Sequence, residues 1–261
     1  MVTAVPDVLA RIVEHKRLEL THILPRRSTL EEQAAQMIAT RRDFRQALLA
    51  KSPAIIAEAK KASPSKGLLA KDFDPARIAR SYQEGGAAAL SVLTDQRFFQ
   101  GSLADLAAAR DAVGMPVLRK DFTIDEVHVV EAAAHGADAI LLIAAVLTTA
   151  EMERFRALAA SYGMAALVEV HNGEELARAI DSGAEILGVN NRDLHTFQVT
   201  LDTSLKLAER MPSSAVRVSE SGIHSNSDVR TLQAAGYHAF LVGEHLMKAP
   251  DPTDALKCLL A

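Results

Sequence analysis

The sequence predicts an α/β protein, a (β/α)8 (TIM) barrel at residues 51–261 with an N-terminal helical extension at residues 1–50 packed on it. The first observation behind this prediction is a glycine that recurs about every 50 residues. It lies each time between a helical pattern and a short apolar run, at Gly86, Gly136, Gly183 and Gly236. Glycine readily takes the left-handed conformation that ends a helix, so each repeat predicts a helix followed by a buried strand.

Further apolar runs lie between these repeats, and each of them ends in charged residues. They are Ala54–Lys60, Pro116–Phe122, Ala165–Val170 and Ala215–Glu220. Each repeat therefore holds two strand-helix units, and the four repeats give eight, which matches a closed barrel. Helix starts agree, because Asp74-Pro75 and Asp251-Pro252 each place a capping residue before a proline, and Thr148 to Glu151 predicts a capping box.

The first 50 residues contain helical patterns and no strand pattern. Leu9 and Ile12 lie on one apolar helical stripe, Ser28 to Glu31 predicts a capping box that opens a second helix, and Asp43 predicts the start of a third. We expect this extension to cover an end of the barrel, with the chain forming a single domain overall. An open doubly wound sheet is the alternative fold, disfavoured because no Gly-x-Gly-x-x-Gly pattern follows a predicted strand.

Composition and charge exclude several classes of protein. The 261 residues are 49% hydrophobic, enough for a large core, and the net charge of −4 comes from charges scattered along the chain, without a basic stripe for nucleic acid. The apolar run Ala139 to Leu147 is too short for a membrane span, and the N-terminus lacks a secretion signal. The single cysteine, Cys258, cannot form an internal disulfide.

We therefore expect a cytoplasmic protein without nucleic-acid or membrane partners, either a monomer or a weak homo-oligomer. The histidines are scattered without metal-ligand spacing, so no metal site is predicted.

Charged residues end the first, third, fifth and seventh predicted strands. They are Glu58, Lys60, Lys120, Glu169 and Glu220. Alternate strands of an eight-stranded barrel contribute side chains to one interior layer, so two ammonium groups and three carboxylates are expected to share a small volume. Such crowding shifts pKa values and favours acid-base catalysis. The alternative, a set of separate salt bridges on an exposed rim, explains any one residue better than it explains all five.

The loops after the seventh and eighth strands predict a phosphate site. Ser219 to Ile223 and Leu241 to Glu244 contain Gly222 and Gly243, which let backbone N–H groups approach an anion, next to the start of a short helix. A carboxylate is unfavourable beside a dianion, so at Glu244 we expect the backbone N–H to be used instead.

A basic loop and two aromatic residues follow other strands at the same rim. The loop Lys60 to Gly67 is either a solvated charge run or a second anion-binding loop. Because it lies beside Glu58, the anion-binding loop is at least as well supported as the solvated charge run. Phe99 and Phe122 could hold an aromatic ring, whereas Phe98 is expected in the core.

Longer motifs carry a resemblance to a known family. They are Ile56-Ala-Glu-Ala-Lys-Lys-Ala-Ser-Pro-Ser-Lys-Gly67, Leu90-Ser-Val-Leu-Thr-Asp95, Phe98-Phe-Gln-Gly-Ser102, Leu118-Arg-Lys-Asp-Phe122, Leu167-Val-Glu-Val-His171, Gly188-Val-Asn-Asn-Arg-Asp-Leu194 and Val218-Ser-Glu-Ser-Gly-Ile223. In this order they resemble indole-3-glycerol phosphate synthase of tryptophan biosynthesis, a carbon-carbon lyase (carboxy-lyase). The departures are Ala59, where a larger apolar residue is expected, and Glu244, where some relatives have serine.

The resemblance implies conversion of 1-(2-carboxyphenylamino)-1-deoxyribulose 5-phosphate to indole-3-glycerol phosphate with release of CO2 and water, without a cofactor. The implied catalytic residues are Lys120, Glu169, Glu58, Lys60, Asn190, Glu220 and Ser221. The implied residues that bind this small phosphorylated substrate are Lys60, Ser63, Phe99, Phe122, Leu141, Arg192, Leu194, Gly222, Gly243 and Glu244. Lys120 would protonate the carbonyl oxygen, and Glu169 would exchange protons during dehydration.

Two other functions fit some of the same residues. Lys120 could form a Schiff base in a sugar-phosphate lyase, although three nearby carboxylates favour the charged ammonium. A non-catalytic barrel that binds a phosphorylated metabolite would not need the full set of Glu58, Lys60, Lys120 and Glu169.

Overall fold

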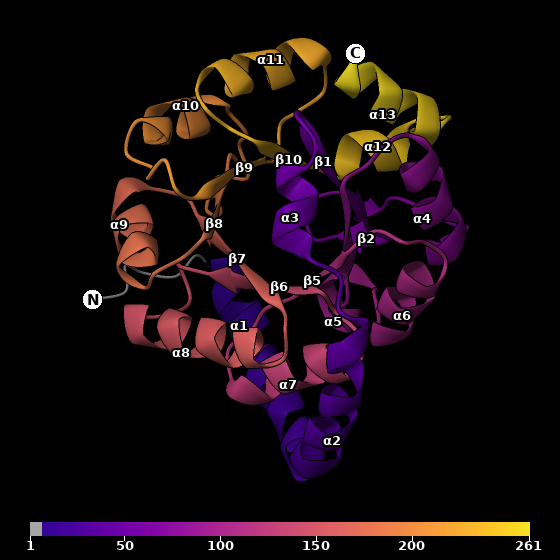
Figure 1. Ribbon diagram of the computed structural model, residues 1–261, viewed down its shortest axis with the longest axis vertical. Coiled ribbons are helices and arrows are strands. Elements are labelled where there is room, and N and C mark those ends of the chain that lie inside the picture. Colours follow the sequence, from indigo (N-terminus) through magenta and orange to yellow (C-terminus); the bar gives the residue numbers. More distant parts are fainter. Residues whose placement is uncertain (1–6) are drawn as a thin grey trace.

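The computed structural model describes residues 7–261, and the first six residues of the predicted extension lie outside this range. Parallel strands close into a barrel in the order β1-β10-β9-β8-β7-β6-β5-β4. The strands are β1 (Ala54–Ala59), β4 (Ala89–Leu93), β5 (Val117–Lys120), β6 (Ala139–Ile143), β7 (Ala165–Val170), β8 (Ile186–Asn190), β9 (Val216–Glu220) and β10 (Ala239–Val242). Figure 1 shows the strands enclosed by a ring of helices, and the predicted (β/α)8 fold is confirmed.

Helices follow the barrel strands, and the longer ones pack outside them. They are α4 (Pro75–Glu84), α5 (Gln96–Phe99), α6 (Leu103–Asp111), α7 (Glu126–Ala134), α8 (Thr149–Ser161), α9 (Gly173–Asp181), α10 (Asp202–Ala208), α11 (Asn226–Ala234), α12 (Glu244–Lys248) and α13 (Pro252–Leu260). A small hairpin, β2 (Ala62–Ser63) and β3 (Gly67–Leu68), forms the basic loop after β1. The chain before β1 contains α1 (Asp7–Ile23), α2 (Arg27–Met37) and α3 (Phe44–Leu49), with 3-10 turns at Leu24–Arg26 and Ile38–Thr40.

The recurring glycines end their helices as predicted. Their φ angles are 96° at Gly86, 85° at Gly136, 76° at Gly183 and 94° at Gly236. In each case a barrel strand begins at the third residue after the glycine. The repeat therefore sets where β4, β6, β8 and β10 begin.

Most predicted helix caps form, and one does not. Asp74, Thr148 and Asp251 each accept a hydrogen bond from a backbone N–H in the first turn of the helix that follows. The predicted cap at Ser28 is wrong, because α2 begins at Arg27. The 3-10 turn at Leu24–Arg26 leads directly into α2, so Ser28 already lies inside the helix and no capping side chain is involved.

Apolar side chains fill two layers, one inside the barrel and one between strands and helices. The inner layer includes Ile56, Leu118 and Val218, all with 1% or less exposure. Phe44 and Leu48 of α3 belong to this inner layer, and α3 contacts β1, β4 and β9. Helix α3 therefore closes one end of the barrel.

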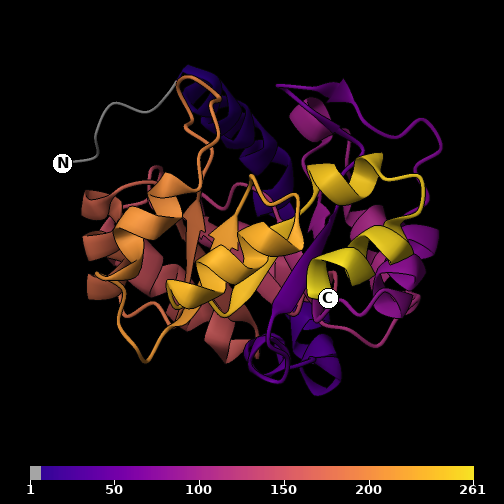
Figure 2. The ribbon, with the colours of Figure 1, turned by 90° about the horizontal axis from the view of Figure 1, so that it is seen from above.

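Helix α1 lies at the other end, above the carboxyl ends of the strands. Figure 2 shows it rising on the same side as the β2–β3 hairpin. Its buried Lys16 places Nζ 2.8 Å from Asp121 Oδ1 and 3.2 Å from Asp95 Oδ2, in the segments that follow β5 and β4. None of the helices within residues 7–261 combines the length and apolar character needed to span a bilayer.

Candidate active site

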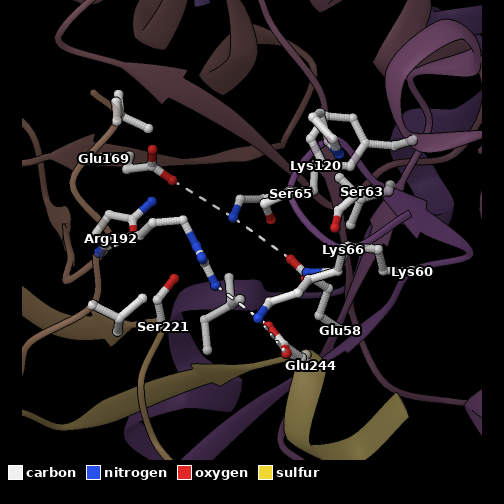
Figure 3. A pocket seen from close by; sticks show the side chains of 18 of the residues that line it. Glu58, Lys60, Ser63, Ser65, Lys66, Lys120, Glu169, Arg192, Ser221 and Glu244 are labelled. Carbon is white, nitrogen blue, oxygen red and sulfur yellow. Dashed lines mark hydrogen bonds and ion pairs between the residues drawn. The ribbon is translucent and has the colours of Figure 1, made fainter. Parts of the chain in front are cut away.

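A cavity of about 360 Å3 opens at the carboxyl ends of the barrel strands (Figure 3). All but one of the predicted site residues line it, namely Glu58, Lys60, Ser63, Phe99, Lys120, Phe122, Leu141, Glu169, Asn190, Arg192, Leu194, Ser221, Gly222, Gly243 and Glu244. The exception, Glu220, is 1% exposed and contacts Lys120 from outside the cavity lining. The structure thus gathers the predicted residues in one place, while their roles remain predictions.

Lys120, at the end of β5, is surrounded by three carboxylates from alternate strands. Its Nζ lies 3.1 Å from Glu220 Oε2, 3.6 Å from Glu169 Oε2 and 3.7 Å from Glu58 Oε2. These acids come from β9, β7 and β1, so their side chains meet in one interior layer. Figure 3 marks the pairs that reach Glu58 and Glu169.

Two glycines provide the space that the carboxylates occupy. A side-chain carbon at Gly243 would collide with Glu58 Oε1, and one at Gly188 would collide with Glu220 Oε1. Lys60 adds a second cation, with Nζ 2.7 Å from Glu58 Oε1. Glu58 is therefore held between the ammonium groups of Lys60 and Lys120.

The charges in this cluster separate the protonation states of the three acids. Burial opposes ionisation of Glu58, but Lys60 and Lys120 outweigh it and lower the pKa. For Glu169 burial acts in the same way, and Lys120, His171 and Asn190 together lower the pKa to about 2. Burial raises the pKa of Glu220 to about 7, because the neighbouring acids add to it while Lys120 only partly compensates.

The ammonium form of Lys120 is strongly favoured. Burial alone would lower the pKa of Lys120, but the carboxylates of Glu220, Glu58 and Glu169 raise it above its ordinary value. The site therefore combines a buried cationic donor with an ionised acceptor, Glu169, and a carboxyl group that exchanges its proton near neutral pH.

His171 belongs to this network and was not predicted as a site residue. Its Nε2 lies 3.4 Å from Glu169 Oε1, and its Nδ1 lies 3.0 Å from Glu175 Oε2. Burial lowers its pKa, but hydrogen bonds and the charges of both glutamates outweigh burial and raise it to about 10. His171 lies two residues after Glu169 and therefore on the same face of the extended chain. The alternation of side chains along the chain was the sequence signal that could have placed it in the site.

The predicted anion end of the cavity lies beside β9 and β10. Ser221 and Gly222 have φ angles of 67° and 80°, which turn the chain sharply after β9. A side chain at Gly222 would press against Val199 Cγ1, 2.6 Å away, so the close approach of this loop requires glycine. Arg192 and Lys66 reach the same end, where both pair with Glu244.

An apolar wall faces these charges. The rings of Phe99 and Phe122 have centroids 6.1 Å apart, and Leu141 and Leu194 line the cavity with them. Leu9 and Ile12 of α1 also line it, and sequence reasoning assigned them to the extension without a role in the site. The expectation that Phe98 lies in the core is wrong, because it is only partly buried, with its ring centroid 6.0 Å from that of His15.

The arrangement suits an organic anion that carries an aromatic ring. Cations and loops lie at one end, apolar side chains at the other, and Lys120 with its acids between them. Within residues 7–261, no group of three or more histidine, cysteine, aspartate and glutamate side chains is placed to hold a metal ion.

Comparisons with known proteins agree with this reading. A family model described as indole-3-glycerol phosphate synthase matches residues 9–259. The chain is 50% identical over 261 residues to an indole-3-glycerol phosphate synthase of Albidiferax ferrireducens, covering 98% of each chain, and 50% identical over 258 residues to one of Chromobacterium violaceum, covering 97% of each.

A solved structure supports the fold alone. Thiamine phosphate pyrophosphorylase from Pyrococcus furiosus superposes with a TM-score of 0.61 at 19% identity, covering 81% of this chain and 95% of that one. Taken with the barrel and its charged cavity, the family match over residues 9–259 shows that this chain belongs to the indole-3-glycerol phosphate synthase family.

Proposed function

We propose that this chain converts 1-(2-carboxyphenylamino)-1-deoxyribulose 5-phosphate to indole-3-glycerol phosphate, releasing CO2 and water. It belongs to a family of carboxy-lyases of tryptophan biosynthesis that act on this small phosphorylated substrate. The observation that carries the assignment of residues is the Lys120 ammonium group within 3.7 Å of Glu58, Glu169 and Glu220.

Lys120 acts as the general acid in ring closure. The ring carbon that bears the carboxylate attacks the C2′ carbonyl, a carbon-carbon bond forms, and the carbonyl electrons move to oxygen as Lys120 delivers a proton there. Loss of CO2 then returns an electron pair to the ring. A positioned acid of this kind contributes about 10²- to 10⁴-fold to the rate.

Glu169 serves the dehydration that follows. Its pKa of about 2 keeps it ionised, so it can remove the proton from the ring nitrogen and deliver a proton to the hydroxyl group, which leaves as water. Glu58 and Glu220 hold the Lys120 ammonium group between them, with Asn190 and Ser221 completing the set beside the reacting atoms.

The two ends of the cavity bind the two ends of the substrate. Gly222 and Gly243 offer backbone N–H groups to the phosphate, with Arg192, Ser63 and the backbone of Glu244 beside it. Phe99, Phe122, Leu141 and Leu194 pack against the ring, and Lys60 binds the carboxylate or the phosphate. Binding energy from the distant phosphate holds the chain folded for attack.

We further propose the division into an N-terminal helical extension at residues 1–50 and a barrel at residues 51–261. We also propose a monomer or weak homo-oligomer, and the net charge of −4, spread along the chain, supports the absence of a nucleic-acid partner. The family's biosynthetic role supports a cytoplasmic location.

The test is to incubate the protein with the anilino-deoxyribulose phosphate and to follow indole absorbance and fluorescence. Lys120→Met should lose about 10²- to 10⁴-fold in kcat with little change in KM, whereas Lys60→Ala should chiefly raise KM. Lys120→Arg keeps a cation among the three carboxylates, so it controls for misfolding. Near-normal turnover by a folded Lys120→Met variant would refute the assignment, and a borohydride-trapped adduct would favour the Schiff-base lyase.

A further inference from the structure

Glu244 places a carboxylate where the proposed function needs a phosphate group. It lies at the start of α12, directly after Gly243, and lines the cavity together with Gly222 and Ser221. An anion at this position would repel a phosphate dianion, because two like charges a few ångströms apart disfavour each other. The use of its backbone N–H therefore does not explain why the side chain at this position is a carboxylate.

Three cations from three segments converge on the Glu244 carboxylate. Its Oε1 lies 2.6 Å from Lys248 Nζ and 3.8 Å from Lys66 Nζ, and its Oε2 lies 3.5 Å from an Arg192 Nη. Figure 3 shows the side chains of Lys66 and Arg192 reaching Glu244 across the cavity. Burial opposes ionisation of Glu244, but Lys248, Lys66 and Arg192 outweigh it and lower the pKa, so the group is a carboxylate at neutral pH.

The three cations differ in what they can do when a second anion arrives. Arg192 and Lys66 line the cavity, so both can turn from the carboxylate to a phosphate within it. Lys248 does not line the cavity, lies one turn from Glu244 on the same helix, and makes the shortest contact. It can hold the Glu244 carboxylate away from the cavity once the other two cations have left.

We propose that Glu244 is an internal competitor of the substrate's phosphate group. In the empty site its carboxylate neutralises Arg192 and Lys66, and on binding the phosphate takes both cations while Glu244 stays with Lys248. This proposal rests on the proposed function, because it takes the phosphate end of the substrate to lie beside Gly222 and Gly243. The exchange selects for dianions, since a singly charged ligand gains no more from the two cations than the carboxylate it displaces.

The test uses inorganic phosphate and measures its dissociation constant by calorimetry, without turnover. Glu244→Gln keeps the size of the side chain and removes its charge, so phosphate should bind about tenfold more tightly at low ionic strength. The gain should shrink at about 0.5 M salt, where charges are screened. Asp254→Asn is the matched control, because it removes the same charge from a carboxylate that is 73% exposed and also borders the surface hollow next to Glu244.

A second variant tests the role of Lys248. Lys248→Met leaves Glu244 without its retaining partner, so phosphate binding should weaken several-fold in the wild-type background and remain unchanged when combined with Glu244→Gln. The proposal is overturned if Glu244→Gln binds phosphate no better than wild type, if Asp254→Asn gains as much, or if Lys248→Met acts equally in both backgrounds. Indole formation by the wild-type protein is scored separately, so a failure of the proposed function is told apart from a failure of this inference.

Discussion

At the scale of single residues, Glu220 shows how position decides protonation. It is 1% exposed, and among residues 7–261 its Oε1 has no hydrogen-bond partner. The pattern of charged strand ends predicts that Glu220 and Lys120 converge, since strand alternation sets which side chains share a layer. Its protonation state could not be predicted, because the pKa depends on its burial and on the distances to Lys120, Glu169 and Glu58, which lie on strands far away in sequence. His171 is different, because its partners Glu169 and Glu175 are close in sequence and alternation after Glu169 could have indicated it.

The free energy of unfolding should depend on pH because of Glu220. Its pKa is raised from an ordinary 4.5 to about 7, so between these values the folded state keeps a proton that the unfolded state releases. Raising the pH across this window therefore lowers the free energy of unfolding. Glu220→Gln removes the titrating group, so the stability of wild type relative to this variant should fall from pH 4.5 to about pH 7 and level off on either side.

Urea unfolding at several pH values across the window measures this difference. Glu185→Gln, at a carboxylate that is 69% exposed, is the control for loss of an acid elsewhere. A difference between wild type and Glu220→Gln that stays flat or rises with pH would contradict the assignment of the proton to Glu220.

At the scale of elements, α1 is tied to the barrel by a buried charge. Lys16 is 3% exposed and pairs with Asp121 and Asp95, and Asp121 directly follows Lys120. Burial opposes the charge on Lys16, but both aspartates outweigh it and raise the pKa. The helical pattern predicts α1 itself, whereas its docking site depends on pairs more than 75 residues apart in sequence. Capping residues such as Thr148 were predictable because their hydrogen bonds are local.

Lys16→Met should loosen α1 and weaken substrate binding. The substitution leaves the buried Asp95 without its cation and leaves Asp121 with Arg119 alone, which costs about 3–5 kcal/mol of unfolding free energy. KM should rise more than kcat falls, because Leu9 and Ile12 of α1 line the cavity while Lys120 is untouched. Arg17→Met, at an exposed position of the same helix, is the control. Equal KM values for the two variants, or equal unfolding midpoints in urea, would show that Lys16 does not anchor the helix.

At the scale of the whole molecule, the two ends of the barrel have different tasks. The carboxyl end holds the charged cavity under α1, and the other end is closed by the apolar side of α3. The repeat of glycines and charged strand ends predicts the barrel, because each repeat reports a local helix end and a buried strand. The extension was predicted only to cover an end of the barrel. That α1 and α3 take opposite ends follows from the folded path of the chain, which no local pattern encodes.

This division predicts that α3 contributes stability and leaves the chemistry unchanged. Leu48 is fully buried in the inner layer, whereas its neighbour Leu49 is 44% exposed. Leu48→Ala should therefore lower the free energy of unfolding by about 2–5 kcal/mol, and Leu49→Ala by no more than about 0.5 kcal/mol. Both variants should keep the wild-type kcat/KM at temperatures where they are folded, because α3 lies across the barrel from Lys120. Urea unfolding and indole formation measure the two quantities, and a folded Leu48→Ala variant with reduced kcat/KM would show that the two ends of the barrel are coupled.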